Sequence, residues 1–204
     1  MTKRLANEGF VIVSGAAMGV DAISHEAAGT ENTIAVAGTG LDIRYPATNK
    51  KLIENIEKNG LMISQFPPKS PSKAYNFPIR NELVVALGEI LIVAQADLKS
   101  GTMHSVEFAK TMGKKIFVLP HRLGESDGTN TLLSQKTADA IYDIDLFIES
   151  LTGKQASEKK IDPLLEYFGT NPSYDEAMQK YPQEVFEYEL AGKIVIKDGM
   201  VVLN

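Results

Sequence analysis

The sequence contains no cysteine and only three histidines, His25, His104 and His121. Without cysteine the chain can form neither a disulfide framework nor a thiolate metal site. The histidines lie far apart in the sequence, and none stands in an HxxxH or HxH pair, so no metal site is expected. Disulfide scaffolds and zinc-thiolate proteins are therefore excluded, and metal-dependent enzymes are disfavoured.

Long apolar runs and an excess of positive charge are also missing. No run approaches the length that spans a bilayer, and the polar start MTKRLANEG does not resemble a signal peptide, so a soluble cytoplasmic protein is expected. The net charge is −5. A protein that coats DNA non-specifically needs a basic surface, so that class is disfavoured, whereas nucleic acid bound in one local basic groove remains open.

Short apolar runs alternate with helical patterns through the first part of the chain. Strands are expected at residues 10–15, 33–40, 60–66, 89–95 and 114–120, with helices at 21–29, 48–60, 80–87 and 102–112. Near-continuous apolar strands separated by helices indicate a parallel sheet covered on both faces. The predicted fold class is α/β, doubly wound, with a mostly parallel Rossmann-like sheet.

The tail has a different pattern. After a polar stretch, ESLTGKQASEKK (149–160), three short helical segments precede a hairpin with a Lys-Asp-Gly turn. This order is typical of a winged helix. We predict a Rossmann-like domain at 1–150, a linker at 151–160, and a small C-terminal winged-helix-like module at 161–204.

Glycine, hydroxyl and lysine residues gather in the loops that follow the strands, where parallel α/β sheets bind ligands. Glycine lets a backbone approach a ligand, and free N–H groups at a helix start attract anions. For the first loop an empty tight turn remains an alternative, and Ser100 could simply cap its helix. Because Ile43 replaces the third glycine of GxGxxG, dinucleotide binding is only weakly indicated. Together the loops favour phosphate binding by Ser14, Gly15, Gly19, Gly38, Thr39, Gly40, Lys99, Ser100, Gly101 and Thr102.

The longest loop, 66–82, interleaves cations with aromatic residues and holds a single acid, Glu82, at its end. Cations neutralise backbone phosphates and aromatic rings stack on unpaired bases, so a single strand suits this loop better than a duplex. The alternative is that Phe77 and Pro78 pack under the following helix and Arg80 pairs with an acid. The predicted contacts in this loop are Lys73, Phe77, Arg80 and Asn81.

Catalytic residues are harder to find. Ser100 has no His-Asp partner by motif, and Glu107 could act as an acid on the next helix. Asp21 and Asp42 are expected to cap or tether loops. No catalytic constellation follows from these residues.

These loops, in this order, resemble the DprA/Smf family of DNA-processing proteins of natural transformation. The resemblance covers roughly residues 10–148. It implies a Rossmann-like domain that binds single-stranded DNA, protects the incoming strand and helps to load the RecA recombinase, as a homodimer without cofactor or established catalytic activity. It rests on SGAAMGVDAISH (14–25), AVAGTGLDIRYPATN (35–49), FPIRN (77–81), SGTMHSVEFA (100–109) and Gly128-Thr129-Asn130.

The resemblance has departures. The family's opening strand, expected centrally in the sheet, and its phosphate-binding arginine are absent, because this chain starts within the next helix, at Leu5. Either the chain is truncated, or a neighbouring chain or a rearranged sheet fills the gap. Glu82, Glu125 and Asp127 stand where the family is more basic or neutral, which should weaken phosphate attraction.

Two further interpretations concern the tail and a possible enzyme. The segment 183–190 holds three glutamates and no lysine or arginine, and residues 155–204 hold five Lys against nine Asp or Glu, about −4. The module is therefore predicted to bind protein, or its own partner subunit, rather than a DNA groove. SGTMHSVEFA (100–109) also resembles the loop of LOG-type nucleotide phosphoribohydrolases, in which Thr102 would bind phosphate and Glu107 would act as acid or base. Because loop 66–82 suits a polymer, that enzyme is the weaker alternative.

Overall fold

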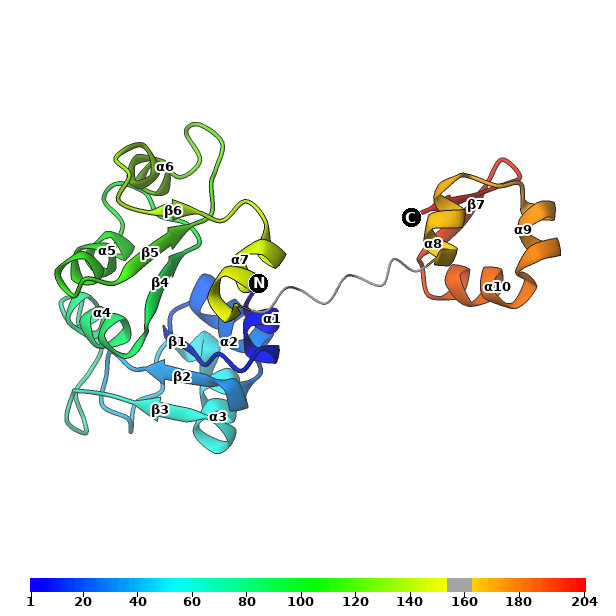
Figure 1. Cartoon of the computed structure of the whole chain (residues 1–204). Helices are drawn as coiled ribbons and strands as arrows, with labels where there is room; N and C mark the ends of the chain where they lie inside the picture. The colour runs from blue at the N-terminus through cyan, green and yellow to red at the C-terminus, as the bar shows by residue number, and fades with distance from the viewer. Residues whose placement is uncertain (154–162) are drawn as a thin grey trace. The chain divides into compact units, whose positions relative to one another are not determined.

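A computed structural model describes residues 1–153 and 163–204 of the chain. The chain divides into two compact units, Met1–Thr152 and Gly153–Asn204 (Figure 1). The last helix of the first unit, α7 (Ile144–Thr152), includes the first two residues of the predicted linker. Residues 154–160 of that linker lie outside the described residues.

The strands of the first unit form two parallel sheets of three strands each. In the first sheet Ile12 is paired with Thr33 and Ile34 with Leu61; in the second, Ile90 is paired with Lys115. The α/β class and the mostly parallel sheet are therefore confirmed. In sheet order the strands are β1 (Ile12–Gly15), β2 (Thr33–Val36) and β3 (Leu61–Ile63), then β4 (Ile90–Val93), β5 (Lys115–Val118) and β6 (Asp139–Ala140).

Helices alternate with these strands, as the apolar periodicity predicts. The helix boundaries lie within two residues of the expected ones with one exception: the helix predicted at 80–87 begins four residues earlier, at Asn76. Pro78 is tolerated there because the N–H groups of a first helical turn have no partner within the helix. The strands predicted at 33–40 and 60–66 are shorter than expected and end at Val36 and Ile63. The helices of this unit, besides α7, are α1 (Thr2–Asn7), α2 (Val20–Ala28), α3 (Lys50–Asn59), α4 (Asn76–Leu87), α5 (Thr102–Thr111) and α6 (Asp127–Ser134).

Apolar side chains hold the two sheets together. Among the described residues no strand pairing joins β1 to β4, yet Ile12 of β1 and Ile90 and Ile92 of β4 pack against one cluster. That cluster is centred on Leu5, Ile141, Phe147 and Ile148. A second core lies between the second sheet and its helices, with Val93, Val106, Val118 and Leu132 buried. The doubly wound arrangement is thus built on two short sheets rather than one continuous ladder.

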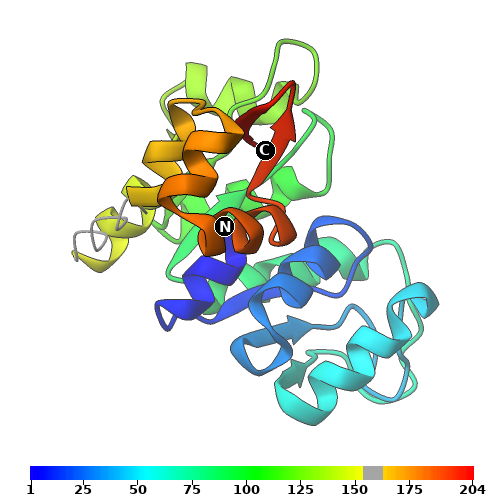
Figure 2. The ribbon, with the colours of Figure 1, turned by 90° about the vertical axis from the view of Figure 1, so that its right-hand side faces the viewer.

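The second unit has the three helices and the hairpin predicted for the tail (Figures 1 and 2). Its core is Phe168, Ala177, Val185, Ile194 and Val201. The hairpin turn lies at Asp198 and Gly199, with φ of 52° and 75°, as a two-residue turn with both φ angles positive requires. Its elements are α8 (Pro163–Gly169), α9 (Tyr174–Lys180), α10 (Pro182–Leu190), β7 (Ile194–Lys197) and β8 (Met200–Leu203).

Candidate nucleic-acid interface

The loops at the carboxyl ends of β1 and β2 meet the N-terminal half of α4. Arg80 of α4 is only 4% exposed, and its Nη1 donates to the Val36 carbonyl at 2.5 Å. A Cβ atom on Gly15 would overlap the Arg80 guanidinium. Gly15 is therefore required for a close approach, but the group that approaches is a side chain of the same protein.

The charge of Arg80 is poorly compensated within the fold. Its Nε donates to the side-chain oxygen of Asn81 at 3.2 Å, and among the described residues no carboxylate pairs with the guanidinium. Burial lowers the pKa of Arg80, and the charge of Asp21 opposes that shift. The guanidinium remains positively charged, because the ordinary arginine pKa lies far above neutrality. A cation therefore lies just beneath this edge of the sheet.

The loop after β1 is held by its own carboxylate. Ser14 Oγ donates to Asp21 at 2.7 Å, and the Ala17 N–H donates to the other oxygen of Asp21 at 3.1 Å. Asn49 donates from its side chain to the carbonyls of Ala16 and Ala17, both at 3.0 Å. Asp21 thus tethers the loop, as its sequence position suggested. A hydroxyl and an amide that could have received a phosphate already have an anionic partner.

His25 supports the same loop from below. Its Nε2 lies 2.7 Å from the Gly15 carbonyl, and its Nδ1 lies within hydrogen-bond distance of the Thr33 hydroxyl. Burial lowers the pKa of His25, so the ring is neutral at pH 7. In the neutral ring Nε2–H donates to the Gly15 carbonyl, because a carbonyl oxygen can only accept. His25 thus links Gly15 of β1 to Thr33 of β2 and acts as a structural residue.

The loop after β2 packs against the loop before α4. Asn76 donates to the Gly38 carbonyl at 2.8 Å, and the Gly40 N–H donates to the Ser70 carbonyl at 3.0 Å. A Cβ on Gly38 would lie 3.0 Å from the Phe77 ring, and one on Gly40 would lie 2.6 Å from a backbone oxygen of the facing loop. These two glycines therefore serve contact between loops rather than open space for a ligand.

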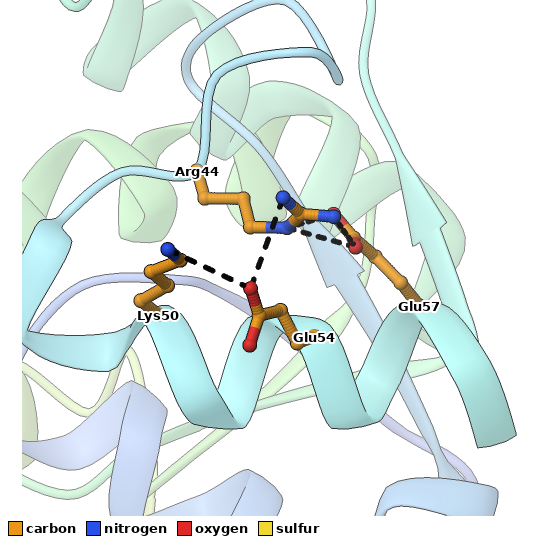
Figure 3. A network of polar contacts seen from close by, with 4 residues as sticks. All are labelled: Arg44, Lys50, Glu54 and Glu57. Carbon is orange, nitrogen blue, oxygen red and sulfur yellow. Dashed lines mark hydrogen bonds and ion pairs between the residues drawn. The ribbon is translucent and has the colours of Figure 1, made fainter.

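Two charged side chains of the loop after β2 hold that loop to its neighbours. The carboxylate of Asp42 accepts the Lys69 N–H at 2.8 Å, which ties the loop after β2 to the loop after β3. Arg44 donates from Nη2 to Glu57 at 2.7 Å, with Glu54 and Lys50 beside it along α3 (Figure 3). Arg44 is thereby held against α3, and its charge is shared with two carboxylates.

The open part of the edge surrounds the start of α5. Lys99 and Gly101 are exposed, and a Cβ on Gly101 would meet nothing within 4 Å. Asn81 donates to the Gly101 carbonyl at 3.4 Å, which brings α4 beside this turn. No side chain caps α5, contrary to the alternative that Ser100 does so, and the buried Ser100 hydroxyl has no hydrogen-bond partner. The N–H groups of Met103 and His104 donate to the carbonyls of Ser100 and Gly101 at 3.0 and 3.2 Å, and the turn that they close carries the exposed Lys99.

Aromatic residues line the neighbouring surface. Tyr75 is 60% exposed, with Lys73 Nζ 5.5 Å from its ring centroid. The ring of the partly exposed Phe77 has two neighbours, the Tyr45 ring at a centroid distance of 6.0 Å and the Arg80 guanidinium, also at 6.0 Å. Sequence reasoning missed Tyr45, although an aromatic residue in a loop at the same edge was the signal that could have found it.

The structure divides the predicted binding residues by exposure. Both polar atoms of the Asn130 side chain, on α6, have partners within the fold: Oδ1 accepts the His121 N–H and Nδ2 donates to the Arg122 carbonyl, each at 3.3 Å. The buried residues build the edge from beneath, and the others form its surface. Buried are Gly15, Gly38, Thr39, Gly40 and Arg80; partly exposed are Ser14, Phe77, Asn81, Ser100, Thr102 and Asn130; exposed are Gly19, Lys73, Lys99 and Gly101.

The edge has few of the features of an enzyme site. Glu107 is exposed and pairs with Lys110 at 2.9 Å, and the Ser100 hydroxyl has no base beside it. Within residues 1–153 and 163–204 no three His, Cys, Asp or Glu side chains gather as a metal site, and no helix is long and apolar enough to cross a membrane.

A parallel α/β unit with lysines and aromatic rings at the carboxyl edge of its strands defines a Rossmann-like protein with a candidate nucleic-acid interface. The particular family follows from comparison with known proteins. The model of the DNA recombination-mediator protein A family matches residues 1–152, so the chain belongs to that family. This confirms the DprA/Smf resemblance drawn from the loops.

Curated relatives and solved structures agree with this assignment. Protein Smf from Synechocystis sp. is 35% identical over 80% of this chain and 43% of its own length, and DNA processing protein DprA from Streptococcus pneumoniae is 39% identical over 64% and 48%. The chain spans about half the length of these relatives, or less. DNA processing protein A from Helicobacter pylori, whose structure is described for its single-stranded DNA binding mode, matches 76% of this chain and 72% of its own with a TM-score of 0.73 and 44% identity.

Proposed function

We propose that this chain is a single-stranded DNA-binding protein that acts in DNA processing during natural transformation. One observation carries the proposal: exposed lysines and aromatic rings, with an uncapped helix start, lie together on the carboxyl edge of the first unit. The family and the described DNA binding of the H. pylori relative support it. The edge is open rather than enclosed by loops, as a polymer requires.

The chemistry of the edge favours an unpaired strand. Lys73 and Lys99 offer charge to phosphates, and Tyr75 and Phe77 offer ring faces to bases. Stacking is worth about 1–3 kcal/mol per base and needs a base that is not already paired and stacked in a duplex. The buried charge of Arg80 adds to the local potential, although the net charge of the chain is −5. Sequence preference is not expected, because the contacts read backbone and ring faces.

The finer parts of the proposal rest on family membership. They are protection of the incoming strand, delivery of that strand to the RecA recombinase, a homodimeric state, a cytoplasmic location and the absence of catalysis and cofactor. We also propose that residues 1–150 form the DNA-binding domain and 161–204 a separate module. A nucleotide hydrolase is disfavoured because Glu107 is exposed and engaged with Lys110.

The proposal is tested by fluorescence anisotropy with a short labelled strand and its duplex across a salt series. We expect tighter binding of the single strand and weaker binding as salt rises. Replacing Lys73 or Lys99 by Ala should raise Kd about fivefold each, which corresponds to about 1 kcal/mol, and should flatten the salt dependence by about 0.7 per lost phosphate contact.

Lys58→Ala is the matched control. Lys58 is exposed near the C-terminus of α3, just before β3, and so lies by the amino edge of the sheet. Its removal should leave Kd within about twofold if only the carboxyl edge binds, a margin that allows for about 0.4 kcal/mol of long-range charge. Equal binding of strand and duplex, or equal effects of all three lysines, would refute the proposed interface. Release of free base from a nucleoside monophosphate would instead support the enzyme.

A further inference from the structure

The outward side of α10 carries an apolar stripe that the rest of residues 163–204 leaves exposed. Gln183, Phe186, Glu187 and Leu190 are exposed and follow the i, i+3, i+4, i+7 spacing of one helix face. Phe186 is 53% exposed and Leu190 89%, whereas Val185, which points to the other side, is fully buried. The inward side of α10 therefore builds the core, and the outward side presents two large apolar side chains to its surroundings.

The charge on this helix has one sign. Glu184, Glu187 and Glu189 lie within a single helix that contains no lysine or arginine. None of the three takes part in an ion pair within the described residues. Two lysines near this helix lie against aromatic rings: Lys193 is 4.3 Å from the ring centroid of Tyr188, and Lys180 is 4.6 Å from that of Tyr167. Within residues 163–204, the apolar stripe thus has an acidic border whose carboxylates form no ion pair.

The exposed apolar side chains and the glutamates of α10 together limit the kinds of molecule that this helix can bind. Phosphates would be repelled by the glutamates, so the helix is unsuited to a DNA groove even though it holds the third-helix position of a winged helix. A second copy of α10 would place glutamates against glutamates, and like charges in contact disfavour association. A polypeptide with apolar side chains flanked by lysine or arginine meets both features at once.

We propose that α10 is the docking surface for a basic amphipathic segment of a partner protein. Phe186 and Leu190 supply the apolar contact, because they are large apolar side chains that this face of the helix leaves exposed and that a partner can remove from water. Glu184, Glu187 and Glu189 pair with cations of the partner and set the orientation and association rate. The inference is independent of DNA binding by the first unit, because it uses residues of the second unit alone.

The test uses the whole chain and two synthetic helical peptides. Both carry leucine at i, i+3, i+4 and i+7; one is flanked by lysines and the other by glutamates. Binding is followed by anisotropy of the labelled peptide and by amide chemical shifts of the isotopically labelled protein. We expect the lysine peptide to bind at least about tenfold more tightly than the glutamate peptide, with shifts centred on residues 183–190.

Variants separate docking from general attraction between a cationic peptide and an acidic protein. Phe186→Ser with Leu190→Ser should weaken the lysine peptide about tenfold or more, and Glu187→Lys with Glu189→Lys should reverse the preference between the peptides. The matched control is Leu123→Ser with Glu125→Lys, an exposed apolar and acidic pair in the first unit, which should change neither. All four α10 positions are exposed, so the variants should fold.

Three outcomes would overturn the inference. The first is equal weakening by the α10 and control variants, which would mean non-specific charge attraction. The second is a shift of α10 amides by duplex DNA, and the third is concentration-dependent self-association abolished by Phe186→Ser with Leu190→Ser. Loss of single-stranded DNA binding would not follow from any of these results, so the two proposals fail separately.

Discussion

Gly15→Ala should destabilise the first unit through Arg80. A Cβ on Gly15 would overlap the buried Arg80 guanidinium, which must then leave the Val36 carbonyl or force the backbones apart. Overpacking of a core typically costs about 1–3 kcal/mol, and a lost hydrogen bond from a charged group costs about 1.5–3 kcal/mol. Movement of Arg80 relieves the overlap but breaks its hydrogen bond, so the two costs are not fully additive. We expect the free energy of unfolding to fall by about 2–4 kcal/mol.

The assay is urea unfolding followed by circular dichroism, with native-state hydrogen exchange at the amides of β1 to assign the transition to the first unit. Exchange is needed because the chain has two units and a single transition is not guaranteed. Gly101→Ala is the matched control. Gly101 has φ −57° and open space around its Cβ position, so the change should be neutral or stabilising by up to about 1 kcal/mol.

A double-mutant cycle isolates the cause. With Arg80 replaced by Ala, the space beside Gly15 is free, and Gly15→Ala should then cost less than about 1 kcal/mol. The expected coupling between the two positions is therefore at least about 1 kcal/mol. If Gly15→Ala is as costly in the Arg80→Ala variant as it is when Arg80 is present, the overlap with the guanidinium is not what requires a glycine at this position.

Three further predictions use other contacts of the first unit. Burial lowers the pKa of His25 below its ordinary 6.5, so near this pH the folded chain binds fewer protons than the unfolded chain. The stability that the neutral His25 ring contributes is therefore complete above about pH 6.5 and is lost as the pH falls, by up to about 1.4 kcal/mol per pH unit. Urea midpoints between about pH 7.5 and 5.5 should therefore fall less steeply in His25→Gln, and an unchanged slope would contradict this. Lys114 donates to the carbonyls of Val85 and Ala86 at 2.6 and 2.7 Å, at the end of α4, so Lys114→Met should cost about 1–3 kcal/mol by urea unfolding, whereas no loss would mean that water replaces the ammonium. Tyr75→Ala should weaken single-stranded DNA binding by about 1–3 kcal/mol and leave stability unchanged; equal loss for single strand and duplex would argue against stacking.

The alternation of strands and helices was predictable because it depends on the local spacing of apolar residues along the chain. The apolar runs that became β1, β2, β4 and β5 are each flanked by helix signals in the sequence. The start of α4 was not predicted: the helix was expected only from Arg80, whereas it begins at Asn76, whose side chain donates to the carbonyl of Gly38, 38 residues away. Division of the strands into two sheets also escaped prediction, because hydrogen bonding between strands depends on their final positions.

Sequence alone determined which residues gather at the candidate interface. In a parallel α/β fold the carboxyl ends of the strands share one edge, so the loops with Gly15, Lys73 and Gly101 had to meet there. Only the tertiary structure decided which of them face outward. Arg80 is buried because it reaches Val36, 44 residues away, and Gly101 is open because no other loop covers it. Exposure is a property of contacts between distant segments, and a local pattern of residue types does not contain it.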